Sequence, residues 1–280
     1  MPELPEVETV CRNLNEKIFE VSKAPKLTNI HLWRKDLRFK IPQADIKKQF
    51  GQSIIGIERR AKFIVIKFAD HFLISHLGMT GSWSFHEGDL KTYNLIKHDH
   101  VALEISNKLW LVYNDPRRFG FLLSFNQKQK HNYFNNYGCE PLQMTDADGD
   151  QLFTQIKALK APVKSVIMNQ KYLVGVGNIY ASEALFLARI KPTKPMNKLK
   201  KSDFKVLISE IKIVLQKAIV AGGSSIKNYR NLDGQSGGFQ LQHWVYNKQN
   251  FLCQRCKADV IKKVLIGGRS TFYCSTCQDV

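Results

Sequence analysis

The 280-residue sequence has no long hydrophobic run, and its first residues do not show the pattern of a secretory leader. No stretch approaches the roughly 18 uninterrupted apolar residues that a membrane span requires. The start of the chain lacks the basic residues followed by an apolar run that mark a secretory signal. The sequence also has no internal repeat and no low-complexity tract. Its hydrophobic fraction of 44% and charged fraction of 24% argue against disorder. We therefore expect a cytoplasmic globular protein, long enough for two domains.

Acidic residues are scarce, with 24 Asp and Glu against 42 Lys and Arg, which leaves a formal net charge of +18. Such an excess indicates a polyanionic partner, and nucleic acid is the first candidate. An acidic membrane surface would match the charge equally well. However, the basic residues are spread over the chain, without a juxtamembrane cluster or a lipidation signal.

Cysteines are few, and four of the six lie in the last 28 residues. Their two Cys-x2-Cys pairs predict one tetrahedral zinc site. Segments 260–264 and 269–273 between the pairs are expected to form short hairpin strands. Disulfides are the alternative, which a reducing cytosol disfavours. The zinc would be structural, because sulfur fills all four positions and leaves none open for water. The expected ligands are Cys253, Cys256, Cys274 and Cys277.

The pattern along the chain predicts an α+β protein. An apolar stripe that includes Cys11 indicates a helix over residues 5–19, with Cys11 as a small buried residue. From about 26 to 126 the sequence has the short runs of a β-sandwich. The expected strands are 53–58, 62–68, 72–77, 100–105, 109–114 and 119–125. The polar segment 143–150 is interpreted as a domain linker.

Helical periodicity returns after that segment, most clearly over 179–188 and 204–220. Gly175 and Gly177 allow a tight turn, and Asn178 is expected to cap the first of these helices. Between residues 157 and 217 there are 13 Lys and Arg against 3 Asp and Glu. The turn is therefore a candidate phosphate site at a helix N-terminus.

Several motifs together give the chain a resemblance to a known family. They are MPELPEVETV at 1–10, HLGMTGS at 76–82, HDHV at 98–101, YNDPRRFG at 113–120, GVGNIYASEALF at 175–186 and the four-cysteine module. In this order they resemble the formamidopyrimidine-DNA glycosylases of bacterial oxidised-purine repair. The resemblance implies a catalytic helix and β-sandwich domain (1–143), a helix-two-turn-helix domain (151–245) and a zinc finger (246–280). It also implies a monomer that binds double-stranded DNA.

The implied activity is that of a bifunctional DNA glycosylase and AP lyase, which excises 8-oxoguanine and formamidopyrimidines. Pro2, exposed by removal of Met1, would form an imine and lead to β,δ-elimination. Glu3 would serve as general acid and base, and Lys62 would assist proton transfer beside a phosphate. Arg269 is also expected among the catalytic residues. From the residues alone, Pro2 could simply lead into a helix, Glu3 could cap it, and Lys62 could end a strand.

The resemblance also implies how DNA is held. Met79, Arg117 and Phe119 would fill the space left by the extruded nucleotide, although a lone Met or Phe is more often a core residue. Glu6 would line the damaged-base pocket, unless it only caps the helix. The pocket would continue in loop 223–238, with Ser224 and Ser225. The expected DNA contacts are His76, His98, Lys164, Asn178, Tyr246 and Arg269, together with the three void-filling residues.

Two rival hypotheses remain at this point. The sister family that resembles endonuclease VIII removes oxidised pyrimidines with the same N-terminal proline. Leu4 and the 223–238 loop favour the purine enzyme instead. A non-catalytic zinc-finger protein that senses damage would explain the charge and the cysteines. It would not explain why Pro2, Glu3 and Lys62 occur together.

Overall fold

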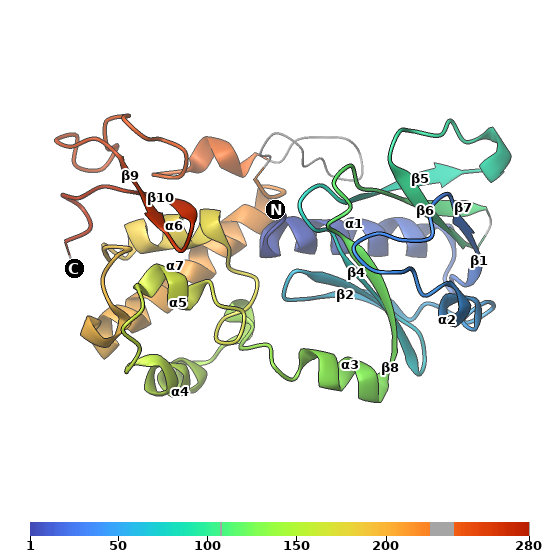
Figure 1. Ribbon diagram of the computed structural model, residues 1–280, viewed down its shortest axis with the longest axis horizontal. Coiled ribbons are helices and arrows are strands. Elements are labelled where there is room, and N and C mark those ends of the chain that lie inside the picture. Colours follow the sequence, from blue (N-terminus) through green and yellow to red (C-terminus); the bar gives the residue numbers. More distant parts are fainter. Residues whose placement is uncertain (107, 225–237, 280) are drawn as a thin grey trace. The chain divides into compact units, whose positions relative to one another are not determined.

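The structure is a computed structural model, which describes residues 1–106, 108–224 and 238–279 (Figure 1). The chain divides into two compact units. Unit 1 comprises Met1–Asn136 and Gly222–Gly238, and unit 2 comprises Tyr137–Ala221 and Phe239–Val280. No helix in the described part of the chain is long and apolar enough to cross a membrane.

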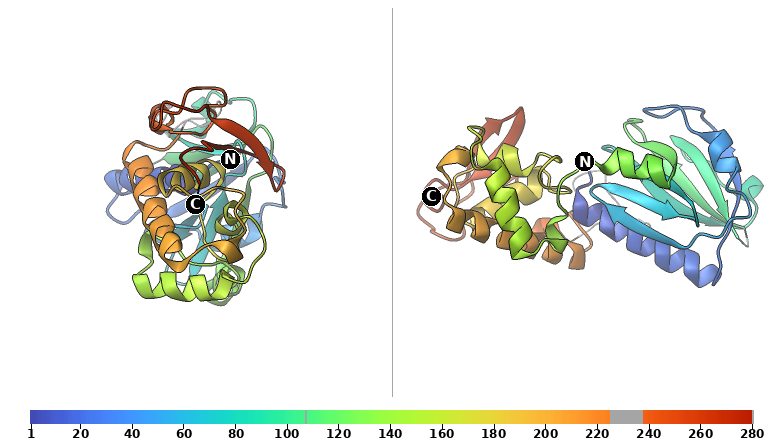
Figure 2. Two further views of the ribbon diagram at one scale, coloured as in Figure 1. Left: turned by 90° about the vertical axis from the view of Figure 1, so that its left-hand side faces the viewer. Right: turned by 90° about the horizontal axis from the view of Figure 1, so that it is seen from below.

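Unit 1 is a sandwich of two antiparallel four-stranded sheets, ordered β1-β6-β7-β5 and β2-β3-β4-β8. Helix α1 packs on β2 and β3 and runs along the strands (Figure 2). The elements are α1 (Leu4–Val21), β1 (Leu27–Leu32), α2 (Gln43–Lys47), β2 (Gly56–Arg60), β3 (Phe63–Lys67), β4 (His71–His76), β5 (Ser82–Glu87), η1 (Leu90–Thr92), β6 (Asp99–Ile105), β7 (Leu109–Asn114), β8 (Phe121–Asn126) and α3 (Gln127–Phe134).

The core of unit 1 explains why β3 is almost continuously apolar. Ile64 and Ile66 belong to the main core with the apolar stripe of α1. Phe63 points to the opposite face, where its ring lies 5.4 Å from that of Phe134 in α3. Because both faces of β3 are covered, alternation between apolar and polar residues is lost. Cys11 lies in the main core, as expected, and burial raises the pKa of its thiol.

Unit 2 combines helices with a two-stranded hairpin. Its elements are η2 (Pro141–Gln143), α4 (Asp146–Ile156), α5 (Val163–Ile167), α6 (Asn178–Leu187), η3 (Met196–Lys198), α7 (Lys201–Val220), η4 (Phe239–Gln242), β9 (Lys262–Ile266) and β10 (Arg269–Tyr273). Gly267 and Gly268 both adopt positive φ, which a two-residue hairpin turn of this twist requires. The expected hairpin is confirmed, with its first strand starting at Lys262.

Most predicted elements of the sandwich are confirmed, but two strands were not predicted. These are β1 and β5. Both carry polar residues on their exposed faces and lack a continuous apolar run, as in SWSFHE of β5. The strand expected at 53–58 begins later, at Gly56, and continues to Arg60.

The linker expected at 143–150 is wrong. Most of this segment belongs to helix α4, which begins at Asp146. The Thr145 hydroxyl accepts a bond from the Asp148 N–H at 3.2 Å, and the Asp148 carboxylate accepts one from the Thr145 N–H at 2.8 Å. These two reciprocal bonds stabilise the start of the helix, and the helix dipole favours acidic residues there. The chain instead passes from one compact unit to the other after Asn136, and again after Ala221 and after Gly238.

Candidate functional site

The start of the chain lies among charged side chains of unit 1. Pro2 and Glu3 are buried, whereas the Met1 side chain is exposed. Burial lowers the pKa of the Met1 α-amino group, and the positive charges of Lys62 and Arg117 lower it further. The carboxylates of Glu3 and Glu6 act in the opposite direction. The fold therefore brings the N-terminal amine, Glu3 and Lys62 within electrostatic reach of one another.

Glu6 joins helix α1 to the chain segment that begins the 223–238 loop. One carboxylate oxygen accepts a bond from the Glu3 N–H at 2.8 Å, which caps α1. The other accepts a bond from the Ser224 N–H at 2.7 Å. Gly223 has φ +83°, and a Cβ on it would lie 2.9 Å from the Glu6 carboxylate, so only glycine fits there. Glu6 thus caps the helix and also contacts Ser224, while Ser225 lies outside the described residues.

Lys62 is not a solvated residue at a strand end. It lies in the turn that directly precedes β3 and is buried. Its charge acts on His76, which ends β4. Burial is the largest cause that lowers the pKa of His76 to about 4, and the charges of Lys62 and Arg38 add to it. His76 is therefore neutral at pH 7.

The neutral His76 ring has a defined orientation. Its Nδ1 accepts a bond from the Gly78 N–H at 3.0 Å. The ring stacks on Phe121, with centroids 5.1 Å apart. Because Nδ1 is the acceptor, Nε2 carries the proton and can donate.

Met79 and Phe119 do not belong to the core. They are 38% and 46% exposed, which rules out the alternative that they are ordinary core residues. The Arg117 guanidinium lies 4.6 Å from the centroid of the Phe119 ring. All three side chains line one hollow of about 720 Å³, together with Met1 and His76. The sequence motifs HLGMTG and DPRRFG thus meet at one place in unit 1.

His98 lies just before β6 and is bonded to the DPRRFG motif. Its backbone adopts a positive φ of 77°, an uncommon conformation for a non-glycine residue. Its carbonyl oxygen accepts a bond from the N–H of Asp115, the residue that begins DPRRFG, at 3.1 Å. The His98 side chain is partly exposed.

In unit 2, Asn178 does not cap helix α6 as predicted. Gly177 is the N-cap, and Asn178 is the first helical residue. Its side-chain amide donates to the Ser270 carbonyl oxygen at 2.9 Å and to the Tyr246 hydroxyl at 3.4 Å. Ser270 directly follows Arg269, whose side chain is exposed. Three expected DNA-contact residues, Asn178, Tyr246 and Arg269, are therefore brought together.

Lys164, which was expected to be an additional DNA contact, is a buried lysine. Its side chain is only 1% exposed. The ammonium donates to Asn178 Oδ1 at 2.7 Å and to Thr271 Oγ1 at 2.8 Å. A buried ammonium must be satisfied in this way. Lys164 therefore fixes Asn178 against strand β10.

Glu183 is an important residue that the sequence analysis missed. Its buried carboxylate accepts bonds from three consecutive backbone N–H groups, those of Trp244, Val245 and Tyr246, at 2.7, 3.0 and 2.7 Å. Burial raises the pKa of this carboxyl, and the three donors offset part of the rise. An acidic residue inside the apolar helix NIYASEALFL was the available signal. Glu183 holds the turn that presents Tyr246.

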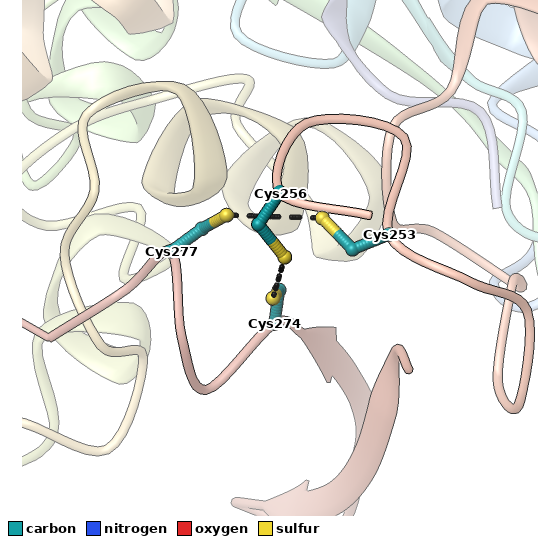
Figure 3. Close-up of side chains that lie close together, drawn as sticks. All are labelled: Cys253, Cys256, Cys274 and Cys277. Atoms are coloured by element: carbon teal, nitrogen blue, oxygen red, sulfur yellow. Dashed lines mark hydrogen bonds between the residues drawn. The ribbon is translucent and has the colours of Figure 1, made fainter. Parts of the chain in front are cut away.

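The four C-terminal cysteines form a cluster (Figure 3). All four sulfur atoms lie within 4.8 Å of one another. The Cys253–Cys277 and Cys256–Cys274 sulfur pairs are 3.8 and 3.7 Å apart. Sulfur atoms at about 2.3 Å from one zinc ion would lie about 3.8 Å apart in a tetrahedron. Backbone N–H groups, chiefly that of Ala258, lower the pKa of Cys256 to about 7. The cluster therefore fits one tetrahedral metal ion.

Domains of DNA glycosylases match most of the chain. The formamidopyrimidine-DNA glycosylase N-terminal domain matches residues 1–122, and the H2TH domain of the same enzymes matches residues 137–230. A formamidopyrimidine-DNA glycosylase of Bdellovibrio bacteriovorus is 43% identical over 279 residues, which cover 99% of this chain and 100% of that protein. One of Wolbachia pipientis is 42% identical over 280 residues, with both chains fully covered.

Solved structures of the Lactococcus lactis enzyme are similar over the whole chain. One complex with DNA that contains an abasic site has a TM-score of 0.88 and 34% identity, and covers 99% of this chain and 100% of the other. A complex with Fapy-dG-containing DNA has a TM-score of 0.86 and 33% identity, with the same coverage. The chain belongs to the formamidopyrimidine-DNA glycosylase family.

Proposed function

We propose that this glycosylase excises oxidised purines from duplex DNA and then cleaves the strand as an AP lyase. Family membership over the full length of the chain is the observation that carries the proposal. The substrate class follows that of the relatives, because one Lactococcus lactis complex contains Fapy-dG in its DNA. The +18 net charge suits a polyanionic partner.

The proposed nucleophile is the secondary amine of Pro2, which becomes free once Met1 is removed. A tertiary amide nitrogen has no available lone pair, so retained Met1 would abolish the reaction. The Pro2 nitrogen attacks C1′ of the damaged nucleotide, and the base departs with the electrons of the glycosidic bond. Pro2 is buried, and removal of a charged amine from water favours its neutral form, which is the form that attacks as a nucleophile.

Glu3 and Lys62 are proposed to handle the protons of this reaction. Glu3 transfers a proton at the deoxyribose as its ring opens and the imine forms. The imine acidifies the C2′ proton, and loss of this proton expels the 3′ phosphate; a second elimination expels the 5′ phosphate. Lys62 assists these transfers beside the flanking phosphate. The electrostatic proximity of these two side chains to the N-terminal amine supports their roles.

The remaining site residues are proposed to hold DNA. Met79, Arg117 and Phe119 occupy the space left by the extruded nucleotide, and the exposure of Met79 and Phe119 supports this role. Arg117 would bond the orphaned cytosine. Glu6 and Ser224 would line the base pocket. The proposed backbone contacts are His76, His98, Asn178, Tyr246 and Arg269.

We propose that the four-cysteine cluster holds one structural Zn²⁺. Cys253, Cys256, Cys274 and Cys277 would be its ligands. When bound, the ion would fix the hairpin β9–β10, which carries Arg269. The sulfur spacing supports a tetrahedral ion.

Replacement of Pro2 by Gly tests the proposal with a duplex that holds 8-oxoguanine opposite cytosine. The parent should cleave this strand, and the P2G variant should lose cleavage while it still binds DNA. Unchanged strand cleavage by P2G would refute the role of Pro2. Absence of excision by the parent, with tight binding to damaged DNA, would favour a damage sensor instead.

Excision of oxidised pyrimidines is the second candidate activity. One Lactococcus lactis complex, with a TM-score of 0.87 and 33% identity, contains an oxidised pyrimidine in its DNA. The same assay with a matched oxidised-pyrimidine duplex decides the order of preference. Faster cleavage of the purine lesion supports the main proposal, and faster cleavage of the pyrimidine lesion supports the second candidate.

A further inference from the structure

Two short loops of unit 1 run side by side because the strands that flank them are paired at both ends. The first loop (77–81) connects β4 to β5 and carries Met79. The second (115–120) connects β7 to β8 and carries Arg117 and Phe119. His76 and Phe121 are paired at one end, and Ser82 and Asn114 at the other. Each loop thus crosses from one sheet to the other at the same edge of the sandwich. We call them the Met79 loop and the Arg117 loop.

The carboxylate of Asp115 is the polar centre of these two loops. Asp115 is fully buried. One oxygen accepts bonds from the Thr80 hydroxyl at 2.5 Å and from the Arg117 N–H at 3.3 Å. The other accepts a bond from the Gly120 N–H at 2.8 Å. The same carboxylate therefore binds the Met79 loop through Thr80, and it binds the middle and the end of its own loop through Arg117 and Gly120.

Thr80 completes this connection from the other side. Its hydroxyl donates to Asp115, and its oxygen also accepts a bond from the Arg117 N–H at 3.2 Å. The hydroxyl thus connects Thr80, the residue that follows Met79, to the backbone of Arg117. Valine has almost the same shape but can neither donate nor accept here.

Close backbone contact leaves the two loops little freedom to move independently. A Cβ on Gly78 would lie 2.4 Å from the Gly120 nitrogen and 2.5 Å from the Phe119 carbonyl carbon. A Cβ on Gly120 would lie 1.8 Å from the Tyr113 hydroxyl oxygen. That hydroxyl donates to the His76 carbonyl oxygen at 3.2 Å. The two loops therefore pack as one body, with their polar bonds inside and their exposed side chains outside.

We propose that Asp115 and Thr80 are positioning residues that hold Met79, Arg117 and Phe119 in the arrangement needed to enter the DNA duplex. This inference rests on the proposed function, because it takes the three side chains to be the void-filling residues. Ordering two exposed loops only upon binding would cost conformational free energy at that moment. Because the bonds to the buried carboxylate order both loops when the protein folds, the three side chains are already arranged before they enter the duplex.

The inference predicts a defect confined to duplex substrates. A duplex has stacked bases that the three side chains must replace, whereas a single strand has no opposite base and no void to fill. The measured quantity is the rate of cleavage at an abasic site in duplex DNA divided by the rate at the same site in single-stranded DNA. A general loss of folded enzyme lowers both rates equally and leaves this ratio unchanged.

Thr80→Val and Thr80→Ser form the matched pair of variants. Loss of a hydrogen bond to a charged group corresponds to a change of about tenfold or more. We expect Thr80→Val to lower the duplex to single-strand ratio about tenfold and Thr80→Ser, which keeps the hydroxyl, to restore it. A ratio for Thr80→Val equal to that of Thr80→Ser would overturn the positioning role.

Asp115→Asn is the second test, which applies even if Thr80→Val fails to fold. The carboxamide has the same size, but its NH2 group would face an N–H donor such as that of Gly120. The duplex to single-strand ratio should fall in this variant as well, and an unchanged ratio would overturn the inference. A parent that cleaves neither abasic substrate would refute the proposed function itself. A parent that cleaves both, with variants of unchanged ratio, would refute only the positioning inference.

Discussion

Replacement of Glu183 should reveal how strongly unit 2 depends on one buried carboxylate. Glu183→Ala removes the acceptor for the N–H groups of Trp244, Val245 and Tyr246. A buried N–H left without an acceptor costs about 1–3 kcal/mol. Only the bond to Val245 is fully buried, so water can partly replace the other two. We expect Glu183→Ala to lower the free energy of unfolding by about 4 kcal/mol.

Glu183→Gln provides a graded comparison. The amide can keep its oxygen toward Val245 and Tyr246, which share one carboxylate oxygen, so only the Trp244 N–H faces a donor. The expected loss is therefore smaller, about 1–2 kcal/mol. Glu16→Ala is the control, because Glu16 is an exposed helical glutamate and its loss should change stability by less than about 0.5 kcal/mol.

Urea unfolding followed by tryptophan fluorescence measures these differences. Trp244 is the one tryptophan of the four in the sequence that falls within unit 2, so its signal reports on the affected turn. Its ring stacks on Phe186, with centroids 5.7 Å apart. Equal losses for Glu183→Ala and Glu183→Gln, or losses below about 1 kcal/mol for both, would refute the account of this carboxylate.

Three further predictions follow from the site. Chelation of the metal should unfold the hairpin that carries Arg269 and weaken DNA binding; normal binding by metal-free protein would contradict a structural ion. Arg269→Ala should weaken binding to damaged and undamaged duplex alike. Arg117→Ala should selectively lower the cleavage of lesions that lie opposite cytosine. An equal loss of cleavage opposite every base would contradict the role of Arg117. Burial lowers the pKa of His76 and of His243 from 6.5 to about 4, so between these values the unfolded chain binds more protons. The free energy of unfolding should therefore keep its full contribution from the two neutral histidines above about pH 6.5. It should decrease as the pH drops from about 6.5 to about 4, by at most about 3 kcal/mol for each histidine. His243→Gln should flatten the profile in urea titrations, and an unchanged slope would count against the shift at His243.

Much of the site could be predicted because its motifs are local in the sequence. The N-terminal motif, each Cys-x2-Cys pair and the glycine turn at 175–177 can be recognised within a few residues, although their contacts reach distant segments, as between Glu6 and Ser224 or Cys253 and Cys277. The interpretation of 143–150 as a linker failed for a related reason. Its polar and acidic composition is typical of a linker, but Thr145 and Asp148 form the cap of a helix.

Contacts between distant segments could not be predicted. Nothing in the local sequence indicates that Lys164 lies beneath Asn178 and Thr271, because that contact depends on how β10 packs on α6. Asp115 stands in the motif DPRRFG, whose arginine and phenylalanine carry the expected DNA contacts. Its role depends on strand register, which places Thr80 beside it. One sequence taken by itself carries no signal for such pairs.

Borohydride trapping tests the central claim most directly. The protein, after removal of Met1, is incubated with a duplex that holds 8-oxoguanine opposite cytosine, and in parallel with a matched oxidised-pyrimidine duplex. The cross-linked peptide is then located by mass spectrometry. The account predicts a cross-link at Pro2 that forms most strongly with the purine lesion. A cross-link at Lys62, or no adduct with either duplex despite tight binding, would contradict it.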